Sequence, residues 1–259
     1  MRNITTVILD WAGTAVDYGS FAPVEAFQTA FAAFGLAPTL GETRAPMGMQ
    51  KRAHIAQMLR GERLAAAWQT AQGRPHTEED IDHIYAAFEP ALFAVLPQFA
   101  EPLPGVLDVM AALRARGIRI GSTTGYTKAM MEVVAPLAAA NGYAPDCLVC
   151  PDDVGGTGRP APYMLWRNLE LLRVGSIHEV LKIGDTAADM QEAKNAGCRC
   201  VGVLVGSSMV GLSAEELAAL NGDAREALFA RAKEQYFAAG ADDVIPDIAS
   251  LPAFLRSLA

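Results

Sequence analysis

The stretch Val7-Ile8-Leu9-Asp10-Trp11-Ala12-Gly13-Thr14-Ala15-Val16-Asp17 decides how the rest of the chain is interpreted. The run from Ile4 to Leu9 is apolar except for two threonines, which predicts a strand buried on both faces of a parallel sheet. Ligands of such sheets bind just beyond the carboxyl ends of the strands. Asp10 comes directly after the apolar run and therefore lies at such an end. Asp10 is therefore a candidate for chemistry. An isolated Leu-Asp-x-x-Gly-Thr can also be a surface turn that Gly13 merely shapes, so the rest of the chain has to decide.

Length and charge limit the possible classes of protein. The chain has 259 residues, of which 51% are hydrophobic and 19% charged, enough for one large domain or for a core with a smaller satellite. The net charge of −8 argues against a nucleic acid or an anionic membrane as partner. No apolar run reaches membrane-spanning length, and the N-terminus lacks a signal-peptide pattern, so we expect a cytoplasmic protein.

The four cysteines fall in two pairs. Cys147-Leu-Val-Cys150 imitates half of a zinc site, and Cys198 with Cys200 could supply the other half. Both pairs lie in apolar, strand-like runs, in which residues three apart point to opposite faces. We therefore expect reduced and mostly buried thiols rather than a metal site or a disulfide.

The region from about 19 to 98 contains only helical patterns. Thr77-Glu78-Glu79-Asp80 resembles a capping box that opens the longest of its helices. The expected helices span 23–34, 40–45, 50–59, 64–71 and 78–96. The shift in composition indicates an inserted helical cap domain at 19–98, with 1–18 and 99–259 forming the core domain.

From Pro104 onward the patterns of strands and helices alternate. Strands are expected at 118–124, 148–150, 180–183, 200–205 and near Val244. Helices are expected at 106–116, 128–140 with an interruption near Pro136, 162–172, 188–196, 214–220 and 224–238, and at the C-terminus. This alternation predicts an α/β fold with a doubly wound, Rossmann-like parallel sheet.

Polar residues stand at the ends of three of these strands, namely Asp10, Thr124 and Asp185, and Asp189 follows one helical turn later. Taken alone, Asp185 and Asp189 could be a helix cap and an exposed helical acid. Taken in order along the chain, Asp10, Thr123-Thr124-Gly125, Arg159 and Gly184-Asp185-Thr186-Ala187-Ala188-Asp189 resemble the motifs of the haloacid dehalogenase superfamily, with Arg159 in place of the usual lysine.

The resemblance implies a role for each motif, and physical chemistry agrees with it. Asp10 is implied as a nucleophile that forms an acyl phosphate, which divides one difficult displacement into two easier ones. Mg²⁺ prefers oxygen ligands, which the carboxylates of Asp10 and Asp185 supply together with the backbone carbonyl of Ala12. Asp189 is expected to support this metal site from behind. Thr124 and Arg159 are expected to hold phosphoryl oxygens.

Ala12 departs from the pattern of the superfamily. Its phosphatases and mutases have a second aspartate at this position, which protonates the leaving alkoxide. With Ala12 that proton donor is missing, so either the leaving group needs no proton or the reaction is a different one. Haloacid dehalogenases also lack this acid, but they need no metal, whereas this chain keeps Asp185 and Asp189.

Lys51 opens a predicted helix and shares one face of it with His54. A lysine in the first turn meets the positive end of the helix dipole, and Arg52 is adjacent. Both effects lower the pKa of an amine, which suits an amine that adds to a carbonyl. The alternative is a solvated Lys-Arg pair at the start of a helix.

The stretches 10–14, 47–51 and 122–127 together resemble the phosphonatase branch of the superfamily. This resemblance implies hydrolysis of the C–P bond of phosphonoacetaldehyde through a Schiff base on Lys51, a cap that closes over the site, and a homodimer. His54 is implied as a further catalytic residue, which lines the imine pocket with Met47 and handles protons there. The implied substrate-binding residues are Met47 and Gly48 in the cap and Gly125 and Tyr126 on the core side. The alternatives are a magnesium-dependent phosphatase of small phosphate esters and a catalytically silent protein that binds Mg²⁺ or phosphate.

Overall fold

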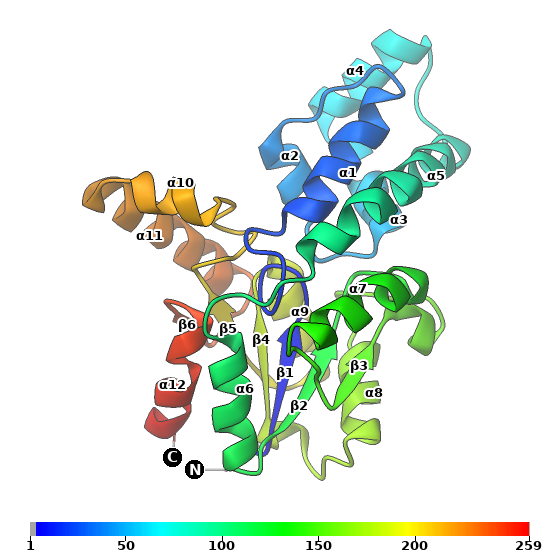
Figure 1. The fold of residues 1–259 in the computed structure, drawn as a ribbon. Coiled ribbons are helices and arrows are strands. Elements are labelled where there is room, and N and C mark those ends of the chain that lie inside the picture. The colour runs from blue at the N-terminus through cyan, green and yellow to red at the C-terminus, as the bar shows by residue number, and fades with distance from the viewer. Residues whose placement is uncertain (1–3, 259) are drawn as a thin grey trace.

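The computed structural model describes residues 4–258, and its centre is a parallel sheet of six strands (Figure 1). The strands are β1 (Thr6–Asp10), β2 (Arg119–Thr123), β3 (Cys147–Val149), β4 (Val180–Gly184), β5 (Arg199–Val203) and β6 (Asp243–Ile245). Their order is β3-β2-β1-β4-β5-β6, so the chain winds outward from β1 first to one side and then to the other. This confirms the predicted α/β class and the doubly wound sheet.

Alternate residues of β1 contribute to two different hydrophobic cores. Val7 and Leu9 lie in the core under α6, α7 and α12, whereas Ile8 lies in the core under α8, α9 and α11. A strand that is apolar at successive positions is therefore explained by burial on both faces. The helices around the sheet are α6 (Val106–Ala115), α7 (Lys128–Ala140), α8 (Tyr163–Leu171), α9 (Ala187–Ala196), α10 (Ala214–Ala219), α11 (Gly222–Ala238) and α12 (Leu251–Ser257).

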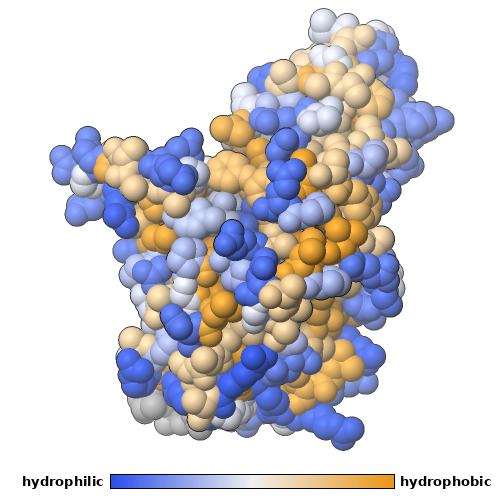
Figure 2. Space-filling view, viewed as in Figure 1, coloured by the Kyte–Doolittle hydropathy of each residue, from blue (hydrophilic) through white to orange (hydrophobic). Residues whose placement is uncertain are grey.

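Five helices between β1 and α6 stand beyond the carboxyl ends of the strands (Figure 1). They are α1 (Phe21–Ala32), α2 (Leu40–Arg44), α3 (Lys51–Leu59), α4 (Glu62–Gln72) and α5 (Glu78–Val95). The predicted capping box is present at the start of α5, where Thr77 and Asp80 exchange hydrogen bonds. Figure 2 shows hydrophilic and hydrophobic residues interspersed over this face, with apolar ones gathered between these helices and α7.

The expected interruption near Pro136 is wrong, because α7 runs without a break from Lys128 to Ala140. Pro136 cannot donate a hydrogen bond to the carbonyl of Glu132, one turn earlier. Both residues are exposed, so water can satisfy that carbonyl and the helix continues. Four short 3-10 helices complete the chain: η1 (Leu96–Phe99), η2 (Pro151–Val154), η3 (Ile177–Glu179) and η4 (Ile248–Ser250).

The loop that follows β1 leads the chain from the sheet into the cap helices. Asp17 accepts hydrogen bonds from the backbone N–H groups of Phe21 and Ala22, at 2.9 and 3.2 Å, and so caps the start of α1. The cysteines are all free; Cys147 is half-buried and the other three are buried, as expected. Among residues 4–258, no helix has the length and the apolar character needed to cross a membrane.

Candidate active site

Asp10 is the last residue of β1 and pairs in register with Thr123 of β2. Its side chain is buried, and Oδ1 lies 2.6 Å from Nη2 of Arg159. Burial raises the pKa of the Asp10 carboxyl, and the positive charge of Arg159 opposes that rise. A cation that binds beside Asp10 would favour the ionised form further, which is the form that can act as a nucleophile.

Asp185 follows β4, the strand next to β1. Its Oδ2 accepts a hydrogen bond of 2.8 Å from the backbone N–H of Ser208. Its Oδ1 is buried and has no hydrogen-bond partner within residues 4–258. Burial raises the pKa of Asp185 well above the ordinary value, and the negative charges of Asp10 and Asp189 add to this effect. A buried carboxylate oxygen without a partner fits a site that holds a cation.

Asp10, Asp185 and Asp189 each offer a carboxylate oxygen, and these oxygens lie within 4.8 Å of one another. Such a set suits a hard divalent cation. Oδ1 of Asp189 lies 3.0 Å from Nζ of Lys182 and 3.1 Å from Nη1 of Arg159. Burial alone would raise its pKa, but these two cations lower it. The charge of Asp189 is thus already compensated, which leaves Asp10 and Asp185 as the better ligands.

Arg159 follows the glycine-rich loop at 155–158 and has a buried side chain. Its Nη2 is bonded both to Asp10 and to Oγ1 of Thr123, each at 2.6 Å. Burial alone would lower the pKa of the guanidinium, but Asp10, Asp189 and Glu192 raise it above the ordinary value. An arginine therefore lies beside the candidate nucleophile, where a partner for a phosphoryl oxygen is needed.

The segment after β2 supplies Thr124, Gly125 and Tyr126. Oγ1 of Thr124 accepts a hydrogen bond of 3.1 Å from the backbone N–H of Tyr126, which leaves the hydroxyl hydrogen free to donate to a ligand. Gly125 lies against the cap: a Cβ atom at this position would come within 2.8 Å of the carbonyl oxygen of Met49. A glycine is required here because the segment after β2 approaches the loop before α3 so closely.

Core and cap enclose a cavity of about 20 Å³, which has room for one or two water molecules. Gly48 of the cap has a φ of +87°, and a Cβ atom there would lie 2.4 Å from Oγ1 of Thr186 in the core. The cavity is lined from the cap by Met47, Gly48 and Lys51, and otherwise by Asp10, Ala12, Ser20, Thr124, Gly125, Tyr126, Arg159, Asp185 and Thr186. Residues that are far apart in the chain thus meet around one small space.

Lys51 is the only lysine that lines this cavity, and its side chain is buried. Nζ lies 4.8 Å from the ring centroid of Tyr126 and makes no hydrogen bond or ion pair within the described part of the chain. Burial lowers the pKa of Lys51 to about 8, with Arg159 contributing in the same direction and Asp10 opposing it. An amine of this kind is partly neutral near neutral pH and therefore nucleophilic.

The direction of this pKa shift agrees with the expectation, but its source does not. Arg52 points away from the site and pairs with Glu78 and Asp82 at 3.0 and 2.6 Å. Arg52 is not among the causes of the lowered pKa of Lys51, whose main cause is burial. Sequence alone could not predict this, because the burial of Lys51 comes from residues of the core domain.

Comparison with known proteins identifies the family. A family model described as haloacid dehalogenase-like hydrolase matches residues 4–197, and a second HAD-like hydrolase model matches residues 156–250. The chain belongs to the haloacid dehalogenase-like hydrolases. Within this superfamily, it is 46% identical over 255 residues to a protein from Lysinibacillus sphaericus named phosphonoacetaldehyde hydrolase, covering 98% of this chain and 95% of the relative.

Two further proteins support the assignment. A protein from Parabacteroides distasonis, also named phosphonoacetaldehyde hydrolase, is 44% identical over 259 residues, which are 100% of this chain and 98% of the relative. The crystal structure of a phosphonoacetaldehyde hydrolase-like protein from Oleispira antarctica superposes with a TM-score of 0.95 at 36% identity, covering 99% of this chain and 93% of that one. The chain therefore belongs to the phosphonoacetaldehyde hydrolase family of the haloacid dehalogenase-like hydrolases.

Most of the predicted site residues of this hydrolase line the cavity, but His54 and Asp189 do not. Asp189 lies behind the cavity against Arg159 and Lys182, whereas His54 lies elsewhere. Its ring lies inside the cap, 4.0 Å from the ring of Phe27, and Nε2 is 2.8 Å from the carbonyl oxygen of Thr43. Burial, aided by the charge of Lys51, holds the pKa of His54 well below its ordinary value. Nε2 therefore donates to Thr43, and a role for His54 would have to act through Lys51, one helical turn away.

Ser20 lines the cavity without having been predicted, and three further residues behind the site have no counterpart in the predictions either. Ser208 holds Asp185 through its backbone N–H, and Lys182 and Glu192 contact Arg159 or Asp189. Lys182 could have been noticed as a charged residue in an otherwise apolar strand. Glu192 could have been noticed because it lies three positions after Asp189 on the same helix face.

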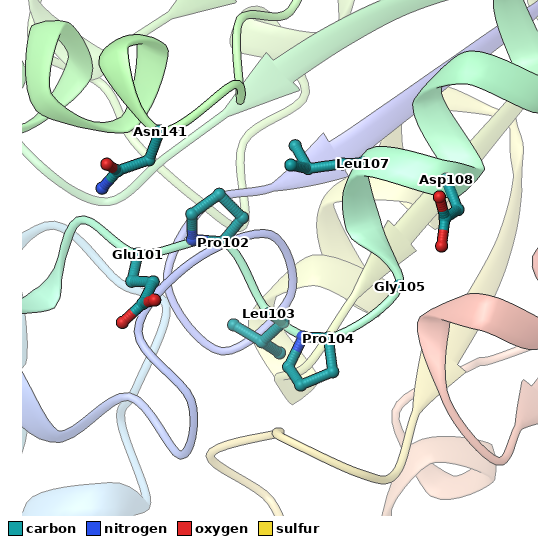
Figure 3. A pocket seen from close by; sticks show the side chains of 8 residues that line it. All are labelled: Glu101, Pro102, Leu103, Pro104, Gly105, Leu107, Asp108 and Asn141. Atoms are coloured by element: carbon teal, nitrogen blue, oxygen red, sulfur yellow. The ribbon is translucent and has the colours of Figure 1, made fainter.

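The surface also has hollows that are larger than this cavity, but volume alone does not identify an active site. One of about 440 Å³ lies where the chain returns from the cap to α6 (Figure 3). Its polar groups are the carboxylates of Glu101 and Asp108 and the amide of Asn141, with no lysine, arginine, histidine or hydroxyl group among its lining side chains. The small cavity between core and cap is therefore the candidate active site.

Proposed function

We propose that this chain hydrolyses the C–P bond of phosphonoacetaldehyde to give acetaldehyde and phosphate. The names of its relatives support this activity. The observation that carries the proposal is the amine of Lys51, which is buried, has no hydrogen bond or ion pair within residues 4–258, and lines the same cavity as Asp10. A phosphatase of simple esters has no use for an uncompensated amine at its reaction centre, whereas an enzyme that forms an imine with an aldehyde requires one.

The core residues are suited to bind the phosphonate group. Arg159 and the hydroxyl of Thr124 donate to its oxygens. Asp10, Asp185 and the backbone carbonyl of Ala12 would hold Mg²⁺, with Asp189 behind them. When bound, the ion supplies positive charge to the phosphoryl oxygens and keeps the two carboxylates ionised.

Lys51 is proposed to act on the aldehyde end. Its neutral amine adds to the carbonyl carbon, water leaves, and the resulting imine takes up a proton. The positively charged imine then draws the electron pair of the C–P bond toward carbon, so that an enamine forms in place of a bare carbanion. Tyr126 supports this charge because the face of its ring lies below Nζ.

Asp10 is proposed to receive the phosphoryl group. One carboxylate oxygen attacks phosphorus as the C–P bond breaks, which gives an aspartyl phosphate. Water then hydrolyses this acyl phosphate, releasing phosphate and restoring Asp10. Protonation of the enamine carbon and hydrolysis of the imine release acetaldehyde and restore the amine of Lys51.

Ala12 fits this reaction better than it fits ester hydrolysis. The leaving group is a carbon atom stabilised by the imine, so no alkoxide needs a proton. In a phosphatase of small esters, which is the second candidate, the missing acid would cost about 10²–10⁴-fold in rate. Rates on phosphate monoesters as high as those on phosphonoacetaldehyde would favour the phosphatase.

Residues 19–98 are proposed to act as a movable cap over the core at 1–18 and 99–259. The cavity of about 20 Å³ is smaller than any aldehyde that bears a phosphonate group. Substrate entry therefore requires the cap to lift, and the cap must close again to bring Lys51 to Asp10.

Borohydride trapping tests the proposal. Borohydride reduces an imine to a stable secondary amine, so treatment in the presence of phosphonoacetaldehyde should add the mass of the reduced substrate or product to Lys51. The variant Lys51→Arg keeps the positive charge but forms no imine, because guanidinium stays protonated. It should lose the label and nearly all release of phosphate.

The exposed Lys128 provides the matched control. Lys128→Arg should be labelled at Lys51 and turn over like the parent enzyme. An active Lys51→Arg enzyme, or a label on another lysine, would exclude the Schiff base while leaving the assignment of Asp10 intact.

A further inference from the structure

Two buried charged residues lie behind the candidate active site without lining its cavity. Lys182 is in the middle of β4 and Glu192 is on α9, and both side chains are 0% exposed. Burying a lysine and a glutamate costs several kcal/mol for each ion unless they are well paired. The proposed chemistry gives neither residue a part, so their presence in the centre of the sheet calls for a reason.

Glu192 holds the inner end of Arg159. Its Oε2 accepts a hydrogen bond of 2.9 Å from Nε of the arginine. The outer nitrogens of the same guanidinium reach Asp10 at 2.6 Å and Asp189 at 3.1 Å. Because the guanidinium is planar and rigid, fixing Nε also fixes the direction in which Nη2 points toward the cavity.

Lys182 lies on the other side of the same acceptors. Its Nζ is 2.7 Å from Oγ1 of Thr123, 3.0 Å from Oδ1 of Asp189 and 3.5 Å from Oε2 of Glu192. The hydroxyl of Thr123 in turn donates to Glu192 at 3.2 Å. Without Lys182, three acids would compete for the single charge of Arg159, and Asp189 and Glu192 would draw the guanidinium away from Asp10.

We propose that Lys182 and Glu192 are positioning residues, which hold Arg159 so that its Nη2 faces Asp10 and a phosphoryl oxygen. Glu192 anchors Nε, and Lys182 supplies the second positive charge that Asp189 and Glu192 require. The inference rests on the proposed function in that Arg159 is taken to bind a phosphoryl oxygen. Lys182 and Glu192 would thus determine the orientation of Arg159 without contacting the phosphoryl group themselves.

The test uses Glu192→Gln, Lys182→Met and the double variant. Glutamine keeps the length of the glutamate side chain, and methionine is one atom shorter than lysine and lacks its charge. The double variant removes both charges together, and replacing a buried pair in this way is often neutral or stabilising, so it is the variant most certain to fold. The matched control is Lys194→Met. Lys194 lies on α9, as Glu192 does, and its exposed side chain pairs at 2.7 Å with Asp242, which precedes β6.

Three quantities are measured: the binding of inorganic phosphate by calorimetry, the kcat for phosphate release, and the labelling of Lys51 by acetaldehyde and borohydride. We expect phosphate affinity and kcat to fall by about 10- to 100-fold in the variants, as for a misplaced binding group. Labelling of Lys51 should stay within about twofold of the parent, because Lys51 belongs to the cap. The effects of the two single variants should not add, since both act on Arg159.

Two outcomes would overturn the inference. One is a double variant that folds, binds phosphate and releases it as the parent does. The other is a loss of phosphate binding, turnover and labelling in proportion to a lowered melting temperature, which is the pattern of a purely structural role. Phosphate binding needs no C–P substrate, so this test remains valid if the proposed reaction proves wrong.

Discussion

The site has a core half around Arg159 and a cap half around Lys51, and the two halves differ in how completely their charged groups are paired. On the core side every nitrogen of Arg159 has an acidic partner, and the acids around it share two cations. On the cap side Lys51 has no hydrogen bond or ion pair within residues 4–258, and Nδ1 of His54 is buried without a partner. Apart from Asp185, whose Oδ1 has no partner within residues 4–258, the core half is dense and compensated. The cap half is sparse and uncompensated.

This difference corresponds to what the proposed reaction requires of each half. Binding and transfer of a phosphoryl group need fixed charges in fixed places, which a saturated network supplies. An amine that attacks a carbonyl has to be neutral, and partners that hold its proton would work against this. Under the proposed function, the absence of partners around Lys51 within residues 4–258 matters as much as their abundance around Arg159.

The largest effect is expected from Asp185→Asn, which should reduce phosphate release without reducing the labelling of Lys51. This change removes one of the two best ligands for the cation, whose charge is worth several kcal/mol in the transition state, so phosphate release should fall about 10³-fold or more. Labelling of Lys51 by acetaldehyde and borohydride should stay within about threefold of the parent, because it needs no phosphoryl transfer. Rates of phosphate release and of labelling provide the measurement.

The half-buried Asp243 supplies the control, because Asp243→Asn also removes one carboxylate, but at the first residue of β6, where it pairs with Arg199. It should leave both rates unchanged. Turnover by Asp185→Asn at a near-normal rate in excess chelator would remove the metal from the reaction. Equal loss of both rates would show that the halves do not work independently.

The core half was largely predictable from the sequence. Asp10, Thr124 and Asp185 follow strands that the apolar runs predicted, and parallel strands bring their carboxyl ends to one edge. The order of the sheet then places β2 and β4 on either side of β1. Local sequence patterns thus suffice to predict the position of a functional side chain that stands at the end of a regular strand.

For the cap half, the sequence predicted which residues are candidates but not their burial or their contacts. The helix that begins at Lys51 was expected. The burial of Lys51 was not, because the loop before it packs on Gly125 and Thr186, which are far away in the sequence. His54 shares a helix face with Lys51, yet it packs on Phe27 inside the cap. Lys182 and Glu192 were missed because their proposed role depends on contacts between β4, α9 and the loop that carries Arg159.

An intermediate effect is expected from Gly48→Ala, which hinders the two halves from meeting. The new Cβ atom would lie 2.4 Å from Oγ1 of Thr186, so the cap loop has to shift. A displacement of 1 Å at a reaction centre can cost about 10²-fold, and we expect kcat/KM for phosphate release to fall by about that factor. Gly73→Ala is the control, because Gly73 also has a positive φ but a Cβ atom there would meet no other atom within 4 Å. Equal losses in both variants would assign the effect to backbone strain and not to the contact between cap and core.

The smallest effect, about tenfold per pH unit, should appear in the pH dependence of labelling at Lys51. Acetaldehyde serves as the aldehyde, with excess chelator present so that no metal takes part. Burial lowers the pKa of Lys51 to about 8, so its folded-state amine is neutral above that pH and mostly protonated below it. The rate of labelling by cyanoborohydride should therefore rise from pH 6 to about pH 8 and then level off.

An ordinary lysine would behave differently, because its pKa of 10.5 would let the rate rise through pH 8 and level off more than two units higher. The unfolded protein, labelled in denaturant, should show this second profile and so provides the reference. A folded enzyme with the profile of the unfolded chain would mean that the amine of Lys51 is fully hydrated or paired in solution. In that case the contrast between a compensated core half and an uncompensated cap half would fail at the residue on which it depends most.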